Sequence, residues 1–270
     1  MTPVRLLVTD VDGTLVRSDR TLAPGTLLAA AALRRAGIRL ALVSARATAG
    51  LDMLLEPLGI DTPRAGFNGG AILAPDNRVV AEHVLEPGAS REAVALLEGH
   101  GLDIWVFADN EWLLTDPDGF YIPSEQRSIA MPWRRVGDFA PFHGRIHKIM
   151  GSSRDTGLVA SASADLQARL QGRAAVLRSQ LYYIDVTPPL ATKGDALRRI
   201  ARELGIDPAE VAAIGDMPND LPMFEAAALS FAMGNAPDAV KRAATHVVAD
   251  HDREGWAEAV RILLAHRPPG

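Results

Sequence analysis

The stretch LVTDVDGTL at residues 7–15 gives the first indication of how this chain folds. It continues an apolar run over residues 4–9, which is typical of a short, buried strand. Asp10 and Asp12 end the run, and because they are one residue apart in an extended segment, their side chains point the same way. Two adjacent carboxylates repel each other, so one should have a raised pKa unless a cation lies between them. A nucleophile and a proton donor would fit such a pair, but a simple acidic turn fits it equally well.

Strand and helix patterns alternate through the first and last thirds of the chain. Strands are expected at residues 4–9, 38–43 and 211–214 and near Ser230 and His246, and helices at residues 24–36, 51–58 and 193–204. Residues 67–73 and 79–84, separated by turn residues 75–77, predict a β-hairpin. The alternation predicts an α/β fold in which helices cover both faces of a parallel sheet.

The middle of the chain has a different pattern. We expect a helix, two strands around residues 109–110, a strand near Ile146, a helix at residues 158–170 and two strands around residues 179–180. Short turns between successive strands predict an antiparallel α+β module. We therefore expect one parallel-sheet core, formed by residues 1–84 and 186–270, with a second domain inserted at residues 85–185.

The composition restricts the classes of function. Of the 270 residues, 48% are hydrophobic and 23% are charged, which is ordinary for a soluble globular protein. The formal net charge of -5 at pH 7 gives no electrostatic reason to expect binding to nucleic acid or to an anionic membrane. The absence of cysteine excludes disulfides, thiolate metal sites and a cysteine nucleophile. No segment approaches the ~20 apolar residues of a membrane helix, and the first apolar run is too short for a signal peptide, so we expect a soluble, cytoplasmic protein.

Acidic residues follow the expected strand at residues 211–214, at an edge where ligands bind in open parallel sheets. Asp216 and Asp220 are one helical turn apart, so both can approach one point. Carboxylates are the oxygen ligands that Mg²⁺ prefers. A helix cap would explain one of these acids, but not both of them together with Asn219.

Ser44 and Lys193 extend this set. Ser44 ends the strand at residues 38–43, where its hydroxyl and the following amides could hold a phosphoryl oxygen, although a lone serine there usually caps the next helix. Lys193 begins a helix, where it could neutralise a phosphate. A lone lysine is more often a solvated surface group, so each assignment depends on the residues found with it.

Taken together, these segments strongly resemble the signatures of the haloacid dehalogenase superfamily. The four signatures occur in the family's order, and they are LVTDVDGTL at residues 7–15, VSAR at residues 43–46, Lys193, and IGDMPND at residues 214–220. FNGGA at residues 67–71 and AMGNA at residues 232–236 resemble further marks of the Cof-like phosphatases within the superfamily. The resemblance covers nearly the whole chain and implies a Rossmann-like core with an inserted α+β cap domain at residues 85–185.

The resemblance implies a magnesium-dependent phosphatase that forms a covalent aspartyl-phosphate. Asp10 would attack the phosphorus, and Asp12 would protonate the leaving oxygen and then activate water. The implied ligands of Mg²⁺ are Asp10, the Asp12 carbonyl and Asp216, with Asp220 either binding the metal or orienting a ligand. The implied phosphoryl-binding residues are Ser44, Ala45, Lys193 and Asn219. Phosphoryl transfer depends mainly on positioning and charge neutralisation, which agrees with this set.

Substrate choice is expected to depend on the cap, which would close over the core and exclude water. Its aromatic residues could line a pocket, but we expect most of them to be core residues; they are Trp105, Trp112, Tyr121, Trp133, Tyr182 and Tyr183. Arg46 and Asn68 are candidate substrate contacts, although Arg46 could instead pair with an acid. The expected substrate is a small phosphomonoester, such as a sugar phosphate or a phosphorylated cofactor.

Two positions depart from the commonest pattern of the family. Ala45 stands where many relatives have glycine, which would stiffen the turn after Ser44. EGWA at residues 254–257 stands where Asp-Gly-Val-Ala is frequent. Neither change removes a catalytic group.

Two other functions share these features. A phosphotransferase or phosphomutase on the same scaffold would pass the phosphoryl group to a sugar hydroxyl, and nothing in the sequence excludes it. A receiver-type regulatory module also uses an aspartate, a hydroxyl residue, a lysine and Mg²⁺. Asp12 is a second acid placed to act on a leaving group, and an inserted domain of roughly a hundred residues suits a substrate enclosure, so both favour an enzyme.

Overall fold

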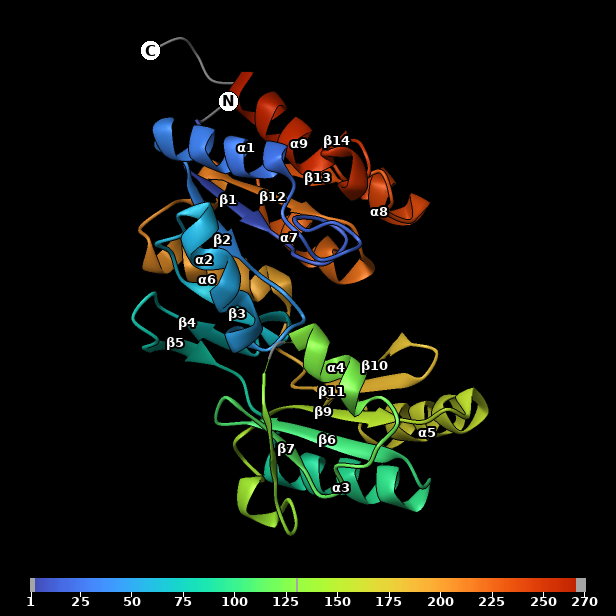
Figure 1. Ribbon diagram of the computed structural model, residues 1–270. Helices are drawn as coiled ribbons and strands as arrows, with labels where there is room; N and C mark the ends of the chain where they lie inside the picture. Colours follow the sequence, from blue (N-terminus) through green and yellow to red (C-terminus); the bar gives the residue numbers. More distant parts are fainter. Residues whose placement is uncertain (1–2, 130, 266–270) are drawn as a thin grey trace. The chain divides into compact units, whose positions relative to one another are not determined.

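The computed structural model describes residues 3–129 and 131–265, which form two compact units (Figure 1). The second unit comprises Arg46–Gly50 and Glu82–Ala191, and the first unit comprises the rest of the described chain. The ends of the expected core, residues 1–2 and 266–270, lie outside the described residues.

The unit boundaries differ from the positions that the sequence patterns indicate. The patterns place the changes after residues 84 and 185, whereas the compact units change after residues 81 and 191. The short segment Arg46–Gly50 also belongs to the second unit. One reason is a side-chain hydrogen bond of 2.7 Å from Thr48 Oγ1 to Asn110 Oδ1.

A five-stranded parallel sheet forms the centre of the first unit. Its order is β14-β13-β12-β1-β2, and the strands are β1 (Leu6–Thr9), β2 (Arg39–Leu42), β12 (Val211–Gly215), β13 (Leu229–Ala232) and β14 (His246–Val247). β1 pairs with both β12 and β2, so that Thr9 lies opposite Ile214 and Leu42. The predicted parallel sheet, built from both ends of the chain, is confirmed.

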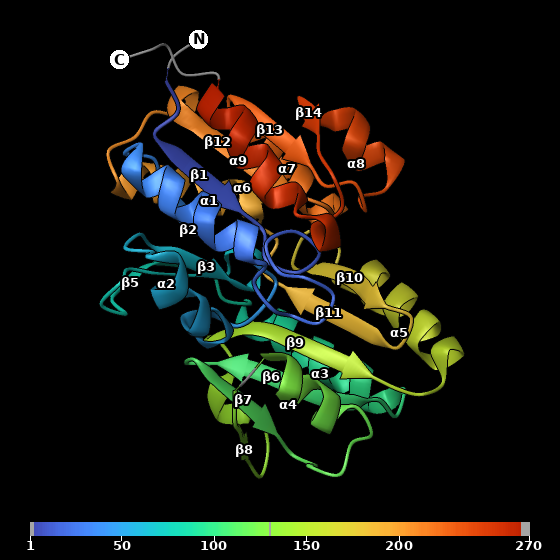
Figure 2. The same ribbon diagram turned by 45° about the horizontal axis from the view of Figure 1, so that its top comes forward.

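Helices cover both faces of this sheet (Figures 1 and 2). They are α1 (Pro24–Arg35), α2 (Asp52–Leu58), α6 (Lys193–Glu203), α7 (Leu221–Ala226), α8 (Asp238–Ala243) and α9 (Gly255–Ala265). Successive residues of a strand point to opposite faces. Leu7 of β1 therefore packs with α1 and α9, whereas Leu6 and Val8 pack with α6 and α7. The two apolar clusters fix the position of β1 between its neighbours.

A small sheet in the order β3-β4-β5 also belongs mainly to the first unit. Its strands are β3 (Arg64–Gly66), β4 (Ala71–Leu73) and β5 (Val79–Glu82). β4 and β5 form the expected hairpin, but the prediction that its first strand starts at residue 67 is wrong. Phe67, Asn68 and Gly69 form a turn instead, and their φ angles of 52°, 57° and 100° are left-handed and incompatible with a strand. β3 was not expected from the sequence.

The second unit contains a six-stranded sheet in the order β10-β11-β9-β6-β7-β8. Its strands are β6 (Asp103–Ala108), β7 (Glu111–Leu114), β8 (Trp133–Arg135), β9 (Ile146–Ser152), β10 (Ala175–Gln180) and β11 (Tyr183–Thr187). Neighbouring strands are antiparallel as predicted, except that β7 and β8 are parallel. The turn expected at residues 179–180 lies later in the chain, because β10 continues to Gln180.

The two faces of this second sheet are covered differently. Helices α3 (Pro87–Gly99) and α5 (Thr156–Arg169) pack against one face and form an apolar cluster with it. The buried residues of this cluster include none from the short helix α4 (Ile122–Ile129). Trp105 contacts Trp112 and Tyr183 edge to face, with ring centroids 5.6 and 5.3 Å apart, and all three are buried. The expectation of core aromatics is therefore confirmed for these three residues. None of the helices within the described ranges combines the length and the apolar character needed to pass through a bilayer.

Candidate active site

Asp10 lies directly after β1, at the carboxyl end of the parallel sheet. Its backbone N–H still donates to the Ile214 carbonyl of β12 at 3.0 Å, and its side chain is buried. The carbonyl of Asp10 accepts from Thr9 Oγ1 at 2.7 Å, and that hydroxyl accepts from Trp256 Nε1 at 3.0 Å. Trp256, one of the departures from the family pattern, thus helps to fix the backbone that carries Asp10.

Lys193 is the first residue of α6 and is only 1% exposed. Its Nζ lies 2.7 Å from Asp10 Oδ1 and 2.6 Å from Asp220 Oδ1. Burial acts to lower the pKa of Lys193, but the two carboxylates outweigh it and raise the pKa above its usual value. The alternative of a solvated surface lysine is therefore wrong, and the ammonium group stays charged between two acids.

Asp216 lies in the turn after β12, where both of its carboxylate oxygens are held. Oδ1 accepts from Thr14 Oγ1 at 2.9 Å, and Oδ2 accepts from Asn235 Nδ2 at 3.1 Å. Gly13 has a left-handed φ of 74°, and a Cβ atom there would lie 2.5 Å from Asp216 Oδ2. Glycine therefore allows the turn after β1 to approach Asp216 this closely. Burial raises the pKa of Asp216 to about 6, although the Thr14 hydrogen bond opposes the increase.

Asp220 is fully buried and stabilises the turn after β12 that carries Asp216. Its Oδ2 accepts the backbone N–H groups of Asp216 and Met217, both at 2.8 Å, while Oδ1 accepts from Lys193. Three donors therefore already occupy this carboxylate. This arrangement favours the orienting role of Asp220 over direct metal binding.

The carboxylates of Asp10, Asp216 and Asp220 lie close together, and their combined charge favours a divalent cation beside them. One oxygen from each lies within 4.8 Å of the others, and all three residues are buried. Burial raises the pKa of Asp10 well above its ordinary value despite the opposing charge of Lys193, and the charges of Asp220 and Asp216 raise it further. One ammonium group does not balance three buried carboxylates. A hard cation that prefers oxygen ligands, such as Mg²⁺, would supply the missing positive charge.

Asp12 is placed differently from the other acids. Its side chain is exposed, and it is not part of the three-carboxylate group. In the turn that follows, the N–H groups of Thr14, Leu15 and Val16 donate to the Val11 carbonyl.

Ser44 and Asn219 both connect to Asn68. Ser44 is buried at the end of β2, and its carbonyl accepts the Asn68 N–H at 2.8 Å. Asn219 donates from Nδ2 to Asn68 Oδ1 at 3.0 Å. The next α-helix after Ser44, α2, begins after Leu51 without a side-chain cap, so the alternative of Ser44 as a helix cap is wrong. Ala45 is half-buried in the bend that follows Ser44.

Arg46 belongs to the second unit, whereas the residues above belong to the first. Its Nη1 lies 3.4 Å from the carbonyl oxygen of Gly50 in the same segment. The role of Arg46 as a substrate contact stays a prediction.

Thr14 and Asn235 were not identified as site residues from the sequence. Asn235 Nδ2 donates to the Gly13 carbonyl at 2.9 Å as well as to Asp216. Its position three residues after β13 was a usable signal, because polar groups that follow the strands of this sheet converge.

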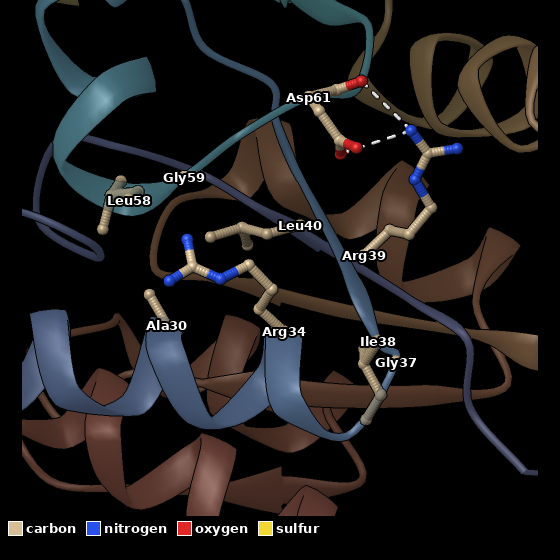
Figure 3. A pocket seen from close by; sticks show the side chains of 9 residues that line it. All are labelled: Ala30, Arg34, Gly37, Ile38, Arg39, Leu40, Leu58, Gly59 and Asp61. Atoms are coloured by element: carbon tan, nitrogen blue, oxygen red, sulfur yellow. Dashed lines mark hydrogen bonds and ion pairs between the residues drawn. The ribbon is translucent and has the colours of Figure 1, made fainter.

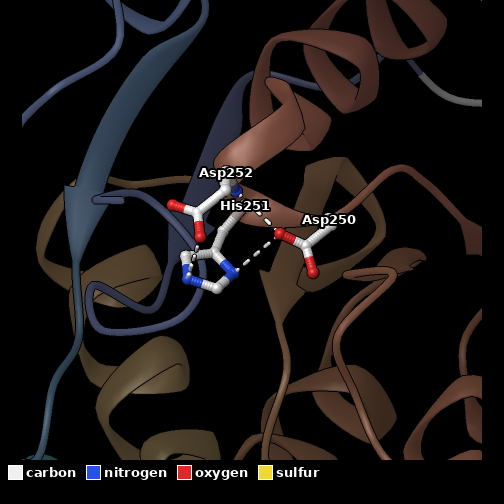
Figure 4. A group of neighbouring side chains, drawn as sticks. All are labelled: Asp250, His251 and Asp252. Carbon is white, nitrogen blue, oxygen red and sulfur yellow. Dashed lines mark hydrogen bonds and ion pairs between the residues drawn. The ribbon is translucent and has the colours of Figure 1, made fainter. Parts of the chain in front are cut away.

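A second acidic group, Asp250, His251 and Asp252, follows β14 (Figure 4). The carboxylate of Asp252 accepts from the backbone N–H and the hydroxyl of Ser18 at 2.9 and 2.6 Å. The His251 N–H donates to Asn235 Oδ1 at 3.2 Å. These contacts give the group a structural role, since they tie the turn after β1 to Asn235.

A cavity of about 270 Å³ opens between α1, the start of β2 and the end of α2 (Figure 3). Arg39 on its wall donates to the carbonyl and carboxylate oxygens of Asp61 at 3.0 and 3.3 Å. It lies at the amino end of β2, whereas Ser44 follows the carboxyl end. The cavity is therefore separate from the carboxylate site.

This fold and site define an enzyme of the hydrolase class. Residues 7–260 match the family model of the haloacid dehalogenase-like hydrolases, so the chain belongs to this family and the resemblance seen in its motifs is confirmed. It is 27% identical to a 5-amino-6-(5-phospho-D-ribitylamino)uracil phosphatase of Bacillus subtilis, with 97% of this chain and 99% of the relative covered. It is 28% identical to an HMP-PP phosphatase of Cronobacter sakazakii, with 97% and 96% covered.

A solved structure shows the same fold. A haloacid dehalogenase-like hydrolase from Bacteroides thetaiotaomicron superposes with a TM-score of 0.88 at 29% identity, and the match covers 96% of this chain and 99% of that one. The similarity extends over both units.

Proposed function

We propose that this enzyme hydrolyses small phosphomonoesters through an aspartyl-phosphate on Asp10 and depends on Mg²⁺. The observation that carries the proposal is the buried ammonium group of Lys193, which lies between Asp10 and Asp220 with Asp216 nearby. A cationic group beside a buried carboxylate favours attack on an anionic phosphate, because it offsets the charge that accumulates in the transition state.

The reaction proceeds in two steps. In the first, a carboxylate oxygen of Asp10 forms a bond to phosphorus, the ester P–O bond breaks, and Asp12 donates a proton to the leaving alcohol. In the second, the Asp12 carboxylate takes a proton from water, whose oxygen attacks the phosphorus. Inorganic phosphate leaves, and the Asp10 carboxylate is restored. The exposure of Asp12 suits this role, since its carboxyl group can exchange protons with water.

Asp10, the Asp12 carbonyl and Asp216 would hold the Mg²⁺ ion. When bound, the ion offsets negative charge on the attacking carboxylate and the phosphoryl oxygens. Asp220 fixes the backbone at Asp216 and orients Lys193. Ser44, Lys193, Asn219 and the bend at Ala45 bind the phosphoryl group.

The substrate is a small phosphorylated metabolite, such as a sugar phosphate or a phosphorylated cofactor. The names of the relatives support this class, because one names 5-amino-6-(5-phospho-D-ribitylamino)uracil and the other HMP-PP as the molecule that the phosphatase acts on. We further propose that residues 1–84 and 186–270 form the catalytic core and residues 85–185 the cap that selects the substrate. Arg46 and residues of the cap are the candidates for contacts to the leaving group.

The experiment that tests this function is phosphate release from a panel of phosphorylated metabolites. Release is measured with Mg²⁺, with a chelator, and with Asp10→Asn protein. Metal-dependent release that disappears in Asp10→Asn supports the proposal. Turnover only in the presence of an added sugar acceptor would instead establish a phosphotransferase, and a stable phosphoenzyme without turnover would establish a regulatory module.

A further inference from the structure

The turn formed by Phe67, Asn68 and Gly69 has an unusual backbone conformation. All three residues are left-handed, with φ angles of 52°, 57° and 100°. This region is unfavourable for a residue with a side chain, above all a bulky one such as phenylalanine, and persists only where the surrounding structure imposes it. Such strain is often found where it positions functional groups.

The turn contacts each of three elements that carry proposed phosphoryl-binding residues. The Asn68 N–H donates to the Ser44 carbonyl at 2.8 Å, and Asn68 Oδ1 accepts from Asn219 Nδ2 at 3.0 Å. Gly69 packs against the residue before Lys193, since a Cβ atom at Gly69 would lie 2.6 Å from the Thr192 carbonyl oxygen. One turn therefore holds the end of β2, the start of α6 and the turn that follows β12.

We propose that Asn68 is a positioning residue of the phosphoryl site and acts through Asn219. The inference rests on the proposed function. A carboxamide nitrogen has two protons. Asn68 Oδ1 accepts one of them and fixes the orientation of the Asn219 carboxamide, which leaves the second proton for a phosphoryl oxygen. The substrate contact expected of Asn68 stays a prediction, because the bond to Asn219 uses only its carboxamide oxygen.

The half-buried Asn219 side chain shows why its orientation needs to be fixed. Its Oδ1 is inaccessible and has no hydrogen-bond partner among the residues that the structure describes. In the reversed orientation this oxygen would face Asn68 Oδ1, and two acceptors would meet. While Asn68 Oδ1 faces Asn219, it selects the orientation in which Asn219 presents N–H groups, the form that binds an anion.

Asparagine suits this position for two reasons. It tolerates a left-handed backbone better than most residues with a side chain, and its oxygen accepts the bond from Asn219. Glycine tolerates the backbone but lacks the acceptor. Asn68→Gly therefore removes the side-chain interaction while the backbone can keep its bond to Ser44.

A double-mutant cycle tests the inference, with the dissociation constant of inorganic phosphate in Mg²⁺ measured by calorimetry. Asn68→Gly is expected to weaken phosphate binding by about tenfold, the loss of one oriented hydrogen bond to an anion. In Asn219→Ala protein the further change Asn68→Gly is expected to have little effect, because Asn68 acts through Asn219. A purely structural role of Asn68 would give additive losses.

Asn77→Gly is the matched control. Asn77 also has a left-handed φ, 66°, and its Oδ1 also accepts a side-chain hydrogen bond, from Arg64 Nη2 at 2.6 Å in the β4–β5 turn. It is expected to leave phosphate binding within about twofold of the wild type. Unchanged binding in Asn68→Gly, additive losses with Asn219→Ala, or a wild-type protein that binds no phosphate would overturn the inference. A wild type that binds phosphate but hydrolyses no ester would contradict the proposed function. The double-mutant cycle would then still test whether Asn68 acts through Asn219 in phosphate binding.

Discussion

The ammonium group of Lys193 lies 2.7 Å from a carboxylate oxygen of Asp10 and 2.6 Å from one of Asp220. All three side chains are almost completely buried, so neighbouring water screens these charges only weakly. Buried charges depend on one another, since removal of one partner leaves the others without compensation. Lys193 is consequently expected to matter both for stability and for reaction.

Lys193→Met should destabilise the metal-free protein by roughly 3–5 kcal/mol, because Asp10 and Asp220 lose their counterion. It should also abolish phosphate release. Urea unfolding and a phosphate assay measure the two effects. Lys148→Met is a suitable control, because Lys148 forms a buried ion pair with Asp185 at 2.9 Å in the second unit. The control should lose stability but still hydrolyse p-nitrophenyl phosphate, whereas hydrolysis by Lys193→Met would contradict the role of Lys193.

Asp10→Asn should eliminate turnover, because an amide oxygen does not replace the carboxylate as nucleophile. The side chain keeps its size, so the fold should be retained, which circular dichroism can check. Mass spectrometry after mixing with substrate should detect no phosphoenzyme. Substantial phosphate release by this variant would remove Asp10 from the role of nucleophile.

Asp12→Asn should slow turnover by roughly 10²–10⁴-fold, the usual effect of losing a general acid and base. A good leaving group such as p-nitrophenolate needs little protonation, so the first step should suffer less than the second. The phosphoenzyme should then accumulate and be visible by mass spectrometry. If Asp12→Asn turned over p-nitrophenyl phosphate at the wild-type rate, the assignment of Asp12 as the base would be wrong.

The metal-free protein should become more stable as the pH falls through about 6, where burial sets the pKa of Asp216. The unfolded chain has its Asp pKa near ~3.9, so between these values the native state binds a proton that the unfolded state lacks. Stability therefore falls as the pH rises through this window, by roughly 1–3 kcal/mol from this group. Thermal unfolding at a series of pH values gives the difference in stability between the wild type and Asp216→Asn, and this difference isolates the contribution of Asp216. A difference independent of pH would contradict the raised pKa.

The stabilisation of the protein by added Mg²⁺ should increase with pH, opposite to the trend of the metal-free protein. The carboxylates must be ionised to bind the metal, so protons compete with it. The increase in melting temperature on addition of Mg²⁺ should be large near neutral pH and shrink below about pH 6. Chelation should reverse the increase, and an equal increase in Asp216→Asn protein would show that the metal binds elsewhere.

Much of the first unit could be predicted because its signals are local. Apolar runs marked β1, β2 and β12, and glycine stops marked the ends of α1 and α6. Because ligands lie at the carboxyl ends of parallel strands, the sequence alone predicts that Asp10 and Asp216 lie close together.

Other features depend on contacts that no local pattern reports. The segment FNGGAIL is apolar enough to suggest a strand, but packing against Thr192 and bonding to Ser44 impose a left-handed turn on its first residues. The orienting role of Asn235 depends on its distance to Asp216. β7 and β8 pair in parallel because a connection that includes α4 separates them, and that stretch carries no clear periodicity.

The pairing of β1 with β12 has a consequence during protein synthesis. Leu6 pairs with Val211, so one edge of β1 stays open while most of the chain is still being translated on the ribosome. The last residue of the second unit is Ala191, so this unit is synthesised before β12, β13 and β14. Asp10 does not meet Lys193 or Asp216 until the last part of the nascent chain has emerged. A growing chain therefore carries Asp10, the proposed nucleophile, through most of translation without the groups proposed to make it reactive.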